Sequence, residues 1–187
     1  MELVVLPDLH SVSNEVPSRS FKGGVTLFAS KPPARDFVRN RVYHILHYMT
    51  LDQKQLVQKT WEKVLPVSES AATLFYGRLF ELDPSTRPLF KHTNMPDQRK
   101  KLMHVIGMAV NGLDMLDKLI PAVRNLGRRH VAYGVTDEHY SSVGRALIWT
   151  LEQGLGADFT PEVKEAWTTV YCLLADTMKD AAVQAAA

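Results

Sequence analysis

Leu126-Gly127-Arg128-Arg129-His130 ends an apolar helical run and stands shortly before a turn at Gly134. Upstream, Gln98 opens a second amphipathic run, and Tyr76 lies within a third. An imidazole, an amide and a phenol therefore belong to three different predicted helices. Such a set could face a flat cofactor from two sides, with His130 as the candidate nitrogen ligand.

Helical periodicity extends outward from this stretch over residues 49–187, without convincing strand alternation. The sequence therefore predicts an all-α domain of six to eight helices. Prolines and capping patterns place the boundaries. We expect one helix to begin at Leu51 after the capping box Thr50–Gln53, a second to run from about Val67 to Leu82, and another to begin near Asp97. A further helix should have Pro121 in its first turn, the next should run from the N-cap Asp137 to Leu155, and the last should begin at Thr160-Pro161. A short turn should lie between Pro84 and Phe90.

Residues 1–48 differ from the rest, because they contain several prolines and glycines and no sustained period. We expect a weakly ordered N-terminal extension there, or an upstream misread of the start, with the domain proper spanning 49–187. Residues 37–48 could extend a helix into the domain. Met49 stands two residues before the capped first helix, where the domain would naturally begin.

The composition is that of a soluble protein, with 45% hydrophobic residues and a formal net charge of +2. The charges show no basic face for nucleic acid. No apolar run reaches the length of a membrane span, and signal-peptide features are missing. The single cysteine, Cys172, suits a reducing compartment. We therefore expect a cytoplasmic protein that binds neither nucleic acid nor membrane.

Six motifs occur in a fixed order between Met49 and about Lys179. They are Leu74–Phe80, Pro88–Phe90, Gln98–Leu102, Leu126–His130, His139–Gly144 and Ala166–Tyr171. In this order they resemble the bacterial single-domain globins, which are similar to the haem domain of flavohaemoglobins. The resemblance implies a globin fold around haem b (iron protoporphyrin IX).

The resemblance also implies roles for the polar residues. His130 corresponds to the proximal iron ligand, and the carbonyl of Leu126 is a natural acceptor for its second nitrogen. Tyr76 and Gln98 correspond to distal residues that donate hydrogen bonds to O2. Taken singly, each has a plainer interpretation: a helix-end histidine, a core tyrosine and a solvated first-turn glutamine.

Apolar residues would form the walls around the porphyrin. Phe90 matches a phenylalanine that packs on the ring, Leu102 matches a residue over the iron, and Val143 is a further wall residue, together with Val105 and Ile106. Plain core packing would look similar. The side chains of Arg99, Lys101 and Arg129 could reach the propionates, but a solvated helix surface explains them equally well.

The proximal side departs from the flavohaemoglobin pattern. Tyr140 matches a tyrosine that pairs with a late glutamate in that group, but the glutamate position falls at about Ala182, and no acid lies nearer than Asp180. This departure favours oxygen binding over strong oxygen activation. The remaining histidines, His10, His44, His47, His92, His104 and His139, are not expected to ligate the iron.

The leading functional hypothesis is reversible binding of O2, with conversion of NO and O2 to nitrate. Because no flavin or nicotinamide module is present, turnover would need an external flavin or ferredoxin-type reductase. The alternative is a non-catalytic oxygen-binding, storage or sensing globin. A globin-like regulatory domain without haem is disfavoured by His130 and Phe90. We expect a monomer or weak homodimer.

Overall fold

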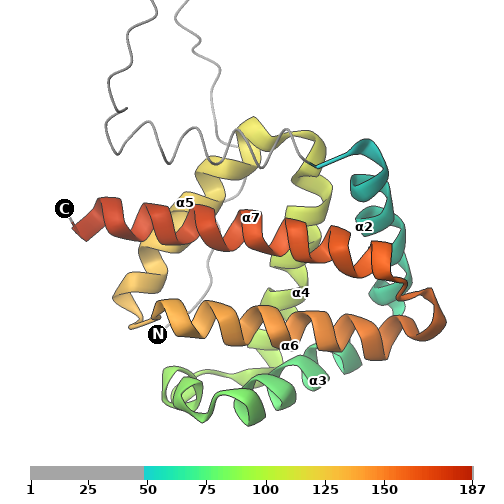
Figure 1. Cartoon of the computed structure of the whole chain (residues 1–187). Coiled ribbons are helices and arrows are strands. Elements are labelled where there is room, and N and C mark those ends of the chain that lie inside the picture. The colour runs from blue at the N-terminus through green and yellow to red at the C-terminus, as the bar shows by residue number, and fades with distance from the viewer. Residues whose placement is uncertain (1–48, 187) are drawn as a thin grey trace, which may run out of the picture.

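The computed structural model describes residues 49–186 as α-helices joined by short 3-10 turns, with no strand in that range. This confirms the predicted all-α class. Figure 1 shows α6 and α7 running across one face, with α4 and α5 crossing behind them. The α-helices are α2 (Leu51–Val64), α3 (Ser68–Leu82), α4 (Met95–Asn111), α5 (Leu116–Ala132), α6 (Asp137–Leu155) and α7 (Pro161–Ala186), and the 3-10 helices are η2 (Leu65–Val67), η3 (Pro84–Phe90), η4 (Gly112–Asp114) and η5 (Gly156–Asp158).

The helix starts agree with the capping signals where those signals are local. The backbone N–H of Gln53 donates to Thr50 Oγ1 at 3.1 Å, and the backbone N–H of Thr50 donates to Gln53 Oε1 at 3.1 Å. This reciprocal pair confirms the predicted capping box. Thr160 caps α7 in a similar way, because its hydroxyl accepts from the N–H of Val163 at 3.4 Å.

Three predicted starts are wrong. Helix α4 begins at Met95, ahead of Asp97, because the side chain of Asn94 caps it. Pro121 lies inside α5 and outside its first turn. The helix tolerates this proline because the carbonyl that loses its partner is that of Asp117, and both residues are exposed to water.

The third correction concerns α6. Thr136, and not Asp137, is its N-cap. The Thr136 backbone N–H donates to Nδ1 of His139 at 3.0 Å. A histidine three residues after the cap thus takes the place that a glutamate or glutamine usually has in a capping box, which the sequence pattern did not reveal.

The main core joins α2 to α7 through two tryptophans. The rings of Trp61 and Trp167 lie 6.2 Å apart, and Trp167 Nε1–H donates to the buried hydroxyl of Thr60 at 2.9 Å. Thr60 in turn donates to the carbonyl of Leu56 at 2.6 Å. The polar atom of Trp167 is therefore satisfied inside the core, as a buried indole requires.

Helices α5 and α7 cross in direct backbone contact at Gly127. A Cβ atom added to Gly127 would lie 2.6 Å from the Cα of Met178, closer than real Cβ atoms come to backbone. Only glycine allows this approach. The crossing holds the C-terminal part of α5, which includes His130, against α7.

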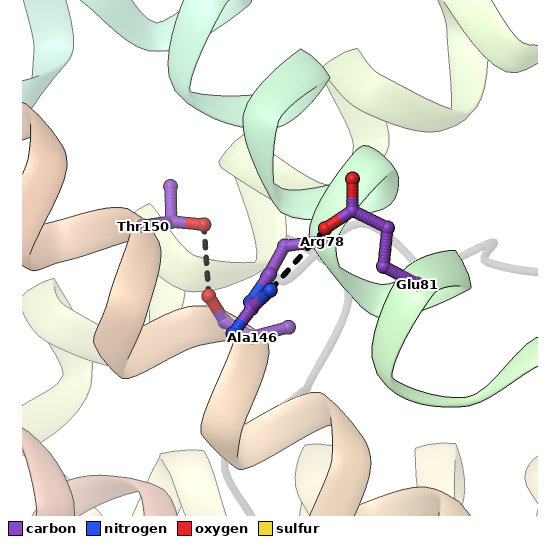
Figure 2. Close-up of polar contacts among 4 residues, drawn as sticks. All are labelled: Arg78, Glu81, Ala146 and Thr150. Carbon is purple, nitrogen blue, oxygen red and sulfur yellow. Dashed lines mark hydrogen bonds and ion pairs between the residues drawn. The ribbon is translucent and has the colours of Figure 1, made fainter.

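Helices α3 and α6 also pack together, and Figure 2 shows Arg78 and Glu81 of α3 beside Ala146 and Thr150 of α6. Arg78 Nη1 lies 3.2 Å from Glu81 Oε2, and its guanidinium lies 5.1 Å from the centroid of the Trp149 ring. Thr150 Oγ1–H donates to the carbonyl of Ala146 at 2.8 Å. This packing brings the helix that carries Tyr76 next to α6.

None of the described helices is long and apolar enough to cross a membrane. The predictions for residues 1–48, including a helix over 37–48 and the three histidines His10, His44 and His47, lie outside the described residues.

Candidate functional site

A cavity of about 200 Å³ opens between α3, α4, α5, α6 and α7. Most of the side chains that line it are apolar. Seven residues predicted for the site line this one cavity, together with Val105 and Ile106: Tyr76, Phe90, Gln98, Leu102, Leu126, His130 and Val143.

On one wall, His130 stands in the last turn of α5. Its Nδ1 lies 2.9 Å from the carbonyl oxygen of Leu126. Because a carbonyl only accepts, Nδ1 carries the hydrogen and Nε2 keeps its lone pair. Burial lowers the pKa of His130, outweighing the Leu126 hydrogen bond that raises it, and the charge of Arg129 lowers it further. The imidazole is therefore neutral at neutral pH, the form that can ligate a metal.

Tyr76 and Gln98 form the polar part of the opposite wall. Their exposed fractions are only 5% and 4%. Burial raises the pKa of the Tyr76 phenol to about 12, although a hydrogen bond with the Gln98 side chain and the charge of Arg99 lower it. Tyr76 thus stays protonated at neutral pH and can donate. The Oε1 atom of Gln98 is buried and has no hydrogen-bond partner among the described residues, so one acceptor of this wall is unpaired.

Aromatic packing fixes the Tyr76 ring. Phe75, Phe80 and Phe90 surround it with centroid distances of 5.1, 6.0 and 5.4 Å. The contacts of Phe75 and Phe90 are edge-to-face, the arrangement that aromatic quadrupoles favour. The phenol is therefore held in place by rings that come from both α3 and η3.

Tyr140 lies beside His130, outside the cavity lining. The two rings stack with centroids 6.1 Å apart and an interplanar angle of 24°. Burial raises the pKa of Tyr140 to about 12, and the charge of Asp137 adds to the effect. The Tyr140 carbonyl accepts a hydrogen bond from the hydroxyl of Tyr171. The tyrosine is thus fixed next to the imidazole, with Lys179 Nζ 5.6 Å from its ring centroid.

The cationic residues that were considered for the propionates differ in their surroundings. Arg99 Nε and the Nε and Nη2 atoms of Arg129 are buried and make no hydrogen bond. Lys101 is partly buried and has an interaction of its own. Buried guanidinium nitrogens without partners are costly, so Arg99 and Arg129 are the better candidates to meet an anionic group.

The other described histidines lie away from the cavity. His104 is exposed and lines a separate cleft between α2 and α4. His92 is exposed after η3, and His139 contacts Ser85 Oγ at 3.2 Å beside the α6 cap. Within residues 49–186, no group of three or more His, Cys, Asp or Glu side chains could hold a metal ion. His130 is therefore the one histidine of the described region that lines the cavity.

A family model described as Globin matches residues 73–178. The chain belongs to the globin family. Neuroglobin of Danio rerio is 33% identical over 138 residues, which cover 67% of this chain and 87% of that protein. Neuroglobin-1 of Oncorhynchus mykiss is 31% identical over 143 residues, covering 70% and 90%. These matches confirm the predicted globin family. Because the similar proteins are vertebrate globins, the bacterial, flavohaemoglobin-like subgroup stays a prediction.

A similar solved structure is described as a hexacoordinated heme protein from an anhydrobiotic tardigrade, at pH 4. The TM-score is 0.66 at 17% identity, and the match covers 73% of this globin and 96% of that chain. At this identity the likeness concerns the fold, and it confirms the predicted globin fold.

Membership of the globin family supports a haem cofactor, and the residues of the cavity fit one. A neutral imidazole presents Nε2 on one wall, and the protonated phenol of Tyr76 and the amide of Gln98 lie on the other. Arg99 and Arg129, which follow Gln98 and precede His130 in the sequence, have buried nitrogens without partners that suit carboxylates. The apolar lining suits a porphyrin face.

Sequence reasoning missed much of the wall. Trp167, Val170, Tyr171, Leu174 and Met178 of α7 all line the cavity. Their spacing is typical of the buried stripe of a helix, but periodicity does not tell whether a stripe faces other side chains or a cavity. Phe75, Leu79, Ala109, Val110 and Leu147 complete the lining.

Proposed function

We propose that this globin holds haem b through His130, binds O2 reversibly, and converts NO with O2 to nitrate when an external reductase supplies electrons. The observation that carries the proposal is that His130, Tyr76 and Gln98, from three different helices, line one apolar cavity. When bound, haem would supply a ferrous iron for diatomic ligands and for the reaction of O2 with NO.

His130 would be the iron ligand through Nε2. Its Nδ1–H donates to the carbonyl of Leu126, which fixes both the tautomer and the orientation of the ring. The neutral backbone acceptor leaves the imidazole less electron-rich than a carboxylate partner would. The Leu126 contact therefore supports binding of O2 more than its activation.

Tyr76 and Gln98 would act on the ligand. The Tyr76 phenol stays protonated, and the Gln98 amide carries two donor hydrogens. Haem would supply the electron density that makes O2 a better hydrogen-bond acceptor, and both donors would stabilise the ligand. Hydrogen bonds to charged groups contribute about 1.5–3 kcal/mol each, and slow release of O2 is the expected consequence.

Three apolar residues would pack against the porphyrin, namely Phe90 from η3, Leu102 from α4 and Val143 from α6. Arg99 and Arg129 would meet the propionates, because their buried nitrogens lack partners within the described residues. The apolar faces of the porphyrin would thus pack against apolar side chains, and its anionic propionates would pair with guanidinium groups.

We further propose that His130 would be the only residue of the described region to hold the haem iron, which would leave the iron available to a diatomic ligand. The tardigrade protein is described as hexacoordinated, but in this globin His130 is the one described histidine that lines the cavity. An amide such as that of Gln98 is a poor iron ligand. A second imidazole would need a large rearrangement of α4, because the exposed His104 lines the separate cleft between α2 and α4.

A second candidate function is oxygen storage or sensing without turnover. The observation that favours it is the cation near Tyr140: Lys179 Nζ lies 5.6 Å from the centroid of the Tyr140 ring, and a positive charge there opposes an electron-rich proximal side. Without that enrichment, the globin would bind O2 but support little catalysis.

Rapid mixing of the O2-saturated ferrous globin with NO tests the main proposal. We expect stoichiometric nitrate and ferric protein, and repeated turnover when a flavin-type reductase is added. Tyr76→Phe and Gln98→Leu should speed O2 loss and reduce the nitrate yield. Reversible O2 binding without nitrate would reject the NO reaction and favour storage or sensing.

We also propose that the functional domain spans residues 49–187 and acts in the cytoplasm as a monomer or weak homodimer. The capped start of α2 beside the buried Met49 supports the domain boundary. Intact-mass measurement of the native protein tests it. A functional requirement for residues 1–48 in O2 binding would contradict it.

A further inference from the structure

Lys179 of α7 is connected to His130 through the ring of Tyr140. Its Nζ lies 5.6 Å from the Tyr140 centroid, and the Tyr140 ring stacks on the imidazole at 6.1 Å. Tyr140 is only 7% exposed, so this arrangement is screened from water on the side of the imidazole. A cation therefore stands next to the aromatic neighbour of the candidate iron ligand.

Within residues 49–186, no carboxylate is found in an ion pair with Lys179. The ion pairs found in the described part of the chain join Lys54 to Asp114, Lys63 to Asp158 and Arg78 to Glu81. Asp176 lines the same groove between α6 and α7 as Lys179, and the ion pairs above do not include it. The carboxylate of Asp137 acts on the Tyr140 hydroxyl, whose pKa its charge helps to raise, whereas Lys179 lies against the ring. The ammonium is held by the face of an aromatic ring, an arrangement that retains its positive field.

We propose that Lys179 is a positioning residue of the proximal side, whose charge against Tyr140 keeps the surroundings of His130 electron-poor and favours the ferrous state of the haem. This inference rests on the proposed function, since it requires a haem held by His130. It identifies a residue that biases this globin toward binding O2 and away from activating it.

The physical argument is electrostatic. One-electron reduction by an external donor converts Fe(III) to Fe(II) and lowers the positive charge of the site by one, without forming or breaking a bond. A fixed cation nearby therefore stabilises the reduced form relative to the oxidised form. Because Tyr140 and His130 are partly or fully buried, solvent screens this effect less than it would at the surface.

The test uses haem-loaded full-length globin and measures the equilibrium constant for reduction against dyes of known potential. We expect Lys179→Met to lower this constant about threefold and Lys179→Glu about tenfold. Lys179→Arg should leave the equilibrium constant for reduction at the wild-type value, because arginine keeps the positive charge. Lys164→Met is the matched control: it removes a lysine of α7 that lines the same groove about four turns away, and should change little.

A second readout separates electrostatics from simple packing. The iron–histidine vibration of the ferrous protein should shift to higher frequency in the order Arg, Met, Glu at position 179. A purely structural role would make Met and Glu alike, and that result overturns the inference, as does an unchanged or raised reduction constant. If instead His130→Gly leaves the ferrous spectrum unchanged, the proposed function itself fails, whatever Lys179 does.

Discussion

The two walls of the cavity hold their polar side chains differently: on the proximal wall the imidazole of His130 is bound to the backbone, whereas on the distal wall the side chains of Tyr76 and Gln98 contact each other. Nδ1 of His130 is bound to the Leu126 carbonyl, and the Tyr140 carbonyl accepts from Tyr171. Across the cavity, Gln98 Oε1 is buried without a partner. An amide oxygen only accepts, so this atom needs a hydrogen-bond donor such as a water, whereas the amide hydrogens of Gln98 and the phenol hydrogen of Tyr76 are the groups that could donate to a ligand.

The two walls also differ in how they are built. The proximal wall depends on the close crossing of α5 and α7 at Gly127, where two backbones touch. The distal wall depends on side chains, because Phe75, Phe80 and Phe90 enclose Tyr76. Backbone contact gives a rigid support for a ligating imidazole. Side-chain packing is more easily rearranged than backbone contact when a small molecule binds, as reversible binding requires.

The strongest test of the proximal wall is His130→Gly. We expect loss of the axial bond, with a changed visible spectrum and weaker haem retention, and partial recovery when imidazole is added to the solution. Absorption spectra of the ferric and ferrous forms measure this. His104→Ala is the control, because His104 is exposed and lines a different cleft. Equal spectra for the wild type and His130→Gly would contradict the assignment of the ligand.

Gly127→Ala tests whether backbone contact supports the proximal wall. Its new methyl group would clash with the backbone of Met178, 2.6 Å from Cα, so we expect a loss of about 3 kcal/mol in the free energy of unfolding. Urea denaturation measures it. Gly77→Ala is the matched control, since no atom lies within 4 Å of its added Cβ in α3, and it should stabilise the globin by up to about 1 kcal/mol. Similar effects of the two substitutions would refute the crossing.

The distal wall is tested by Tyr76→Phe and Gln98→Leu. Each removes one donor to O2, and we expect the O2 dissociation rate to rise about tenfold in each variant, equivalent to about 1.4 kcal/mol. Stopped-flow displacement of O2 by CO measures the rate. Dissociation of CO, which carries less negative charge, provides the control and should change much less. An unchanged O2 dissociation rate in both variants would show that the hydrogen-bond donors of Tyr76 and Gln98 do not contact the ligand.

A smaller effect is expected where η3 meets α6, at the edge of the distal wall. Hydrogen bonds from Ser85 and then Ser142 lower the pKa of the half-buried Asp83 carboxyl below its usual value. A lowered folded-state pKa means that this stabilisation is present above the usual carboxyl pKa and is lost as pH falls through the lowered one. Urea midpoints at about pH 7 and about pH 3 should therefore differ less in Asp83→Asn than in the wild type. The exposed Asp117→Asn is the control, and an equal change in both variants would contradict the role of Asp83.

Most of the fold could be predicted because its signals are local. The capping box at Thr50 and the end of α6 at Leu155 follow from short-range backbone chemistry, and the structure has both. The errors arose where a distant or unusual partner decided the boundary. Pro121 resembles a first-turn residue in isolation, yet η4 and Met115 begin α5 earlier. His139 replaces the usual capping residue, which no common pattern includes.

The residues of the candidate site could be predicted from the sequence, but their arrangement in space could not. Periodicity and motif order were enough to select His130, Tyr76 and Gln98, because residue type limits what each side chain can do near a metal or a ligand. That these three line the same cavity, while His104 lines another, depends on how the helices cross. The position of Lys179 against Tyr140 is likewise a consequence of the contact between α6 and α7. Short stretches of sequence thus determine the helices and the chemical groups that they carry, whereas long-range packing alone determines the cavity and the position of charges around it.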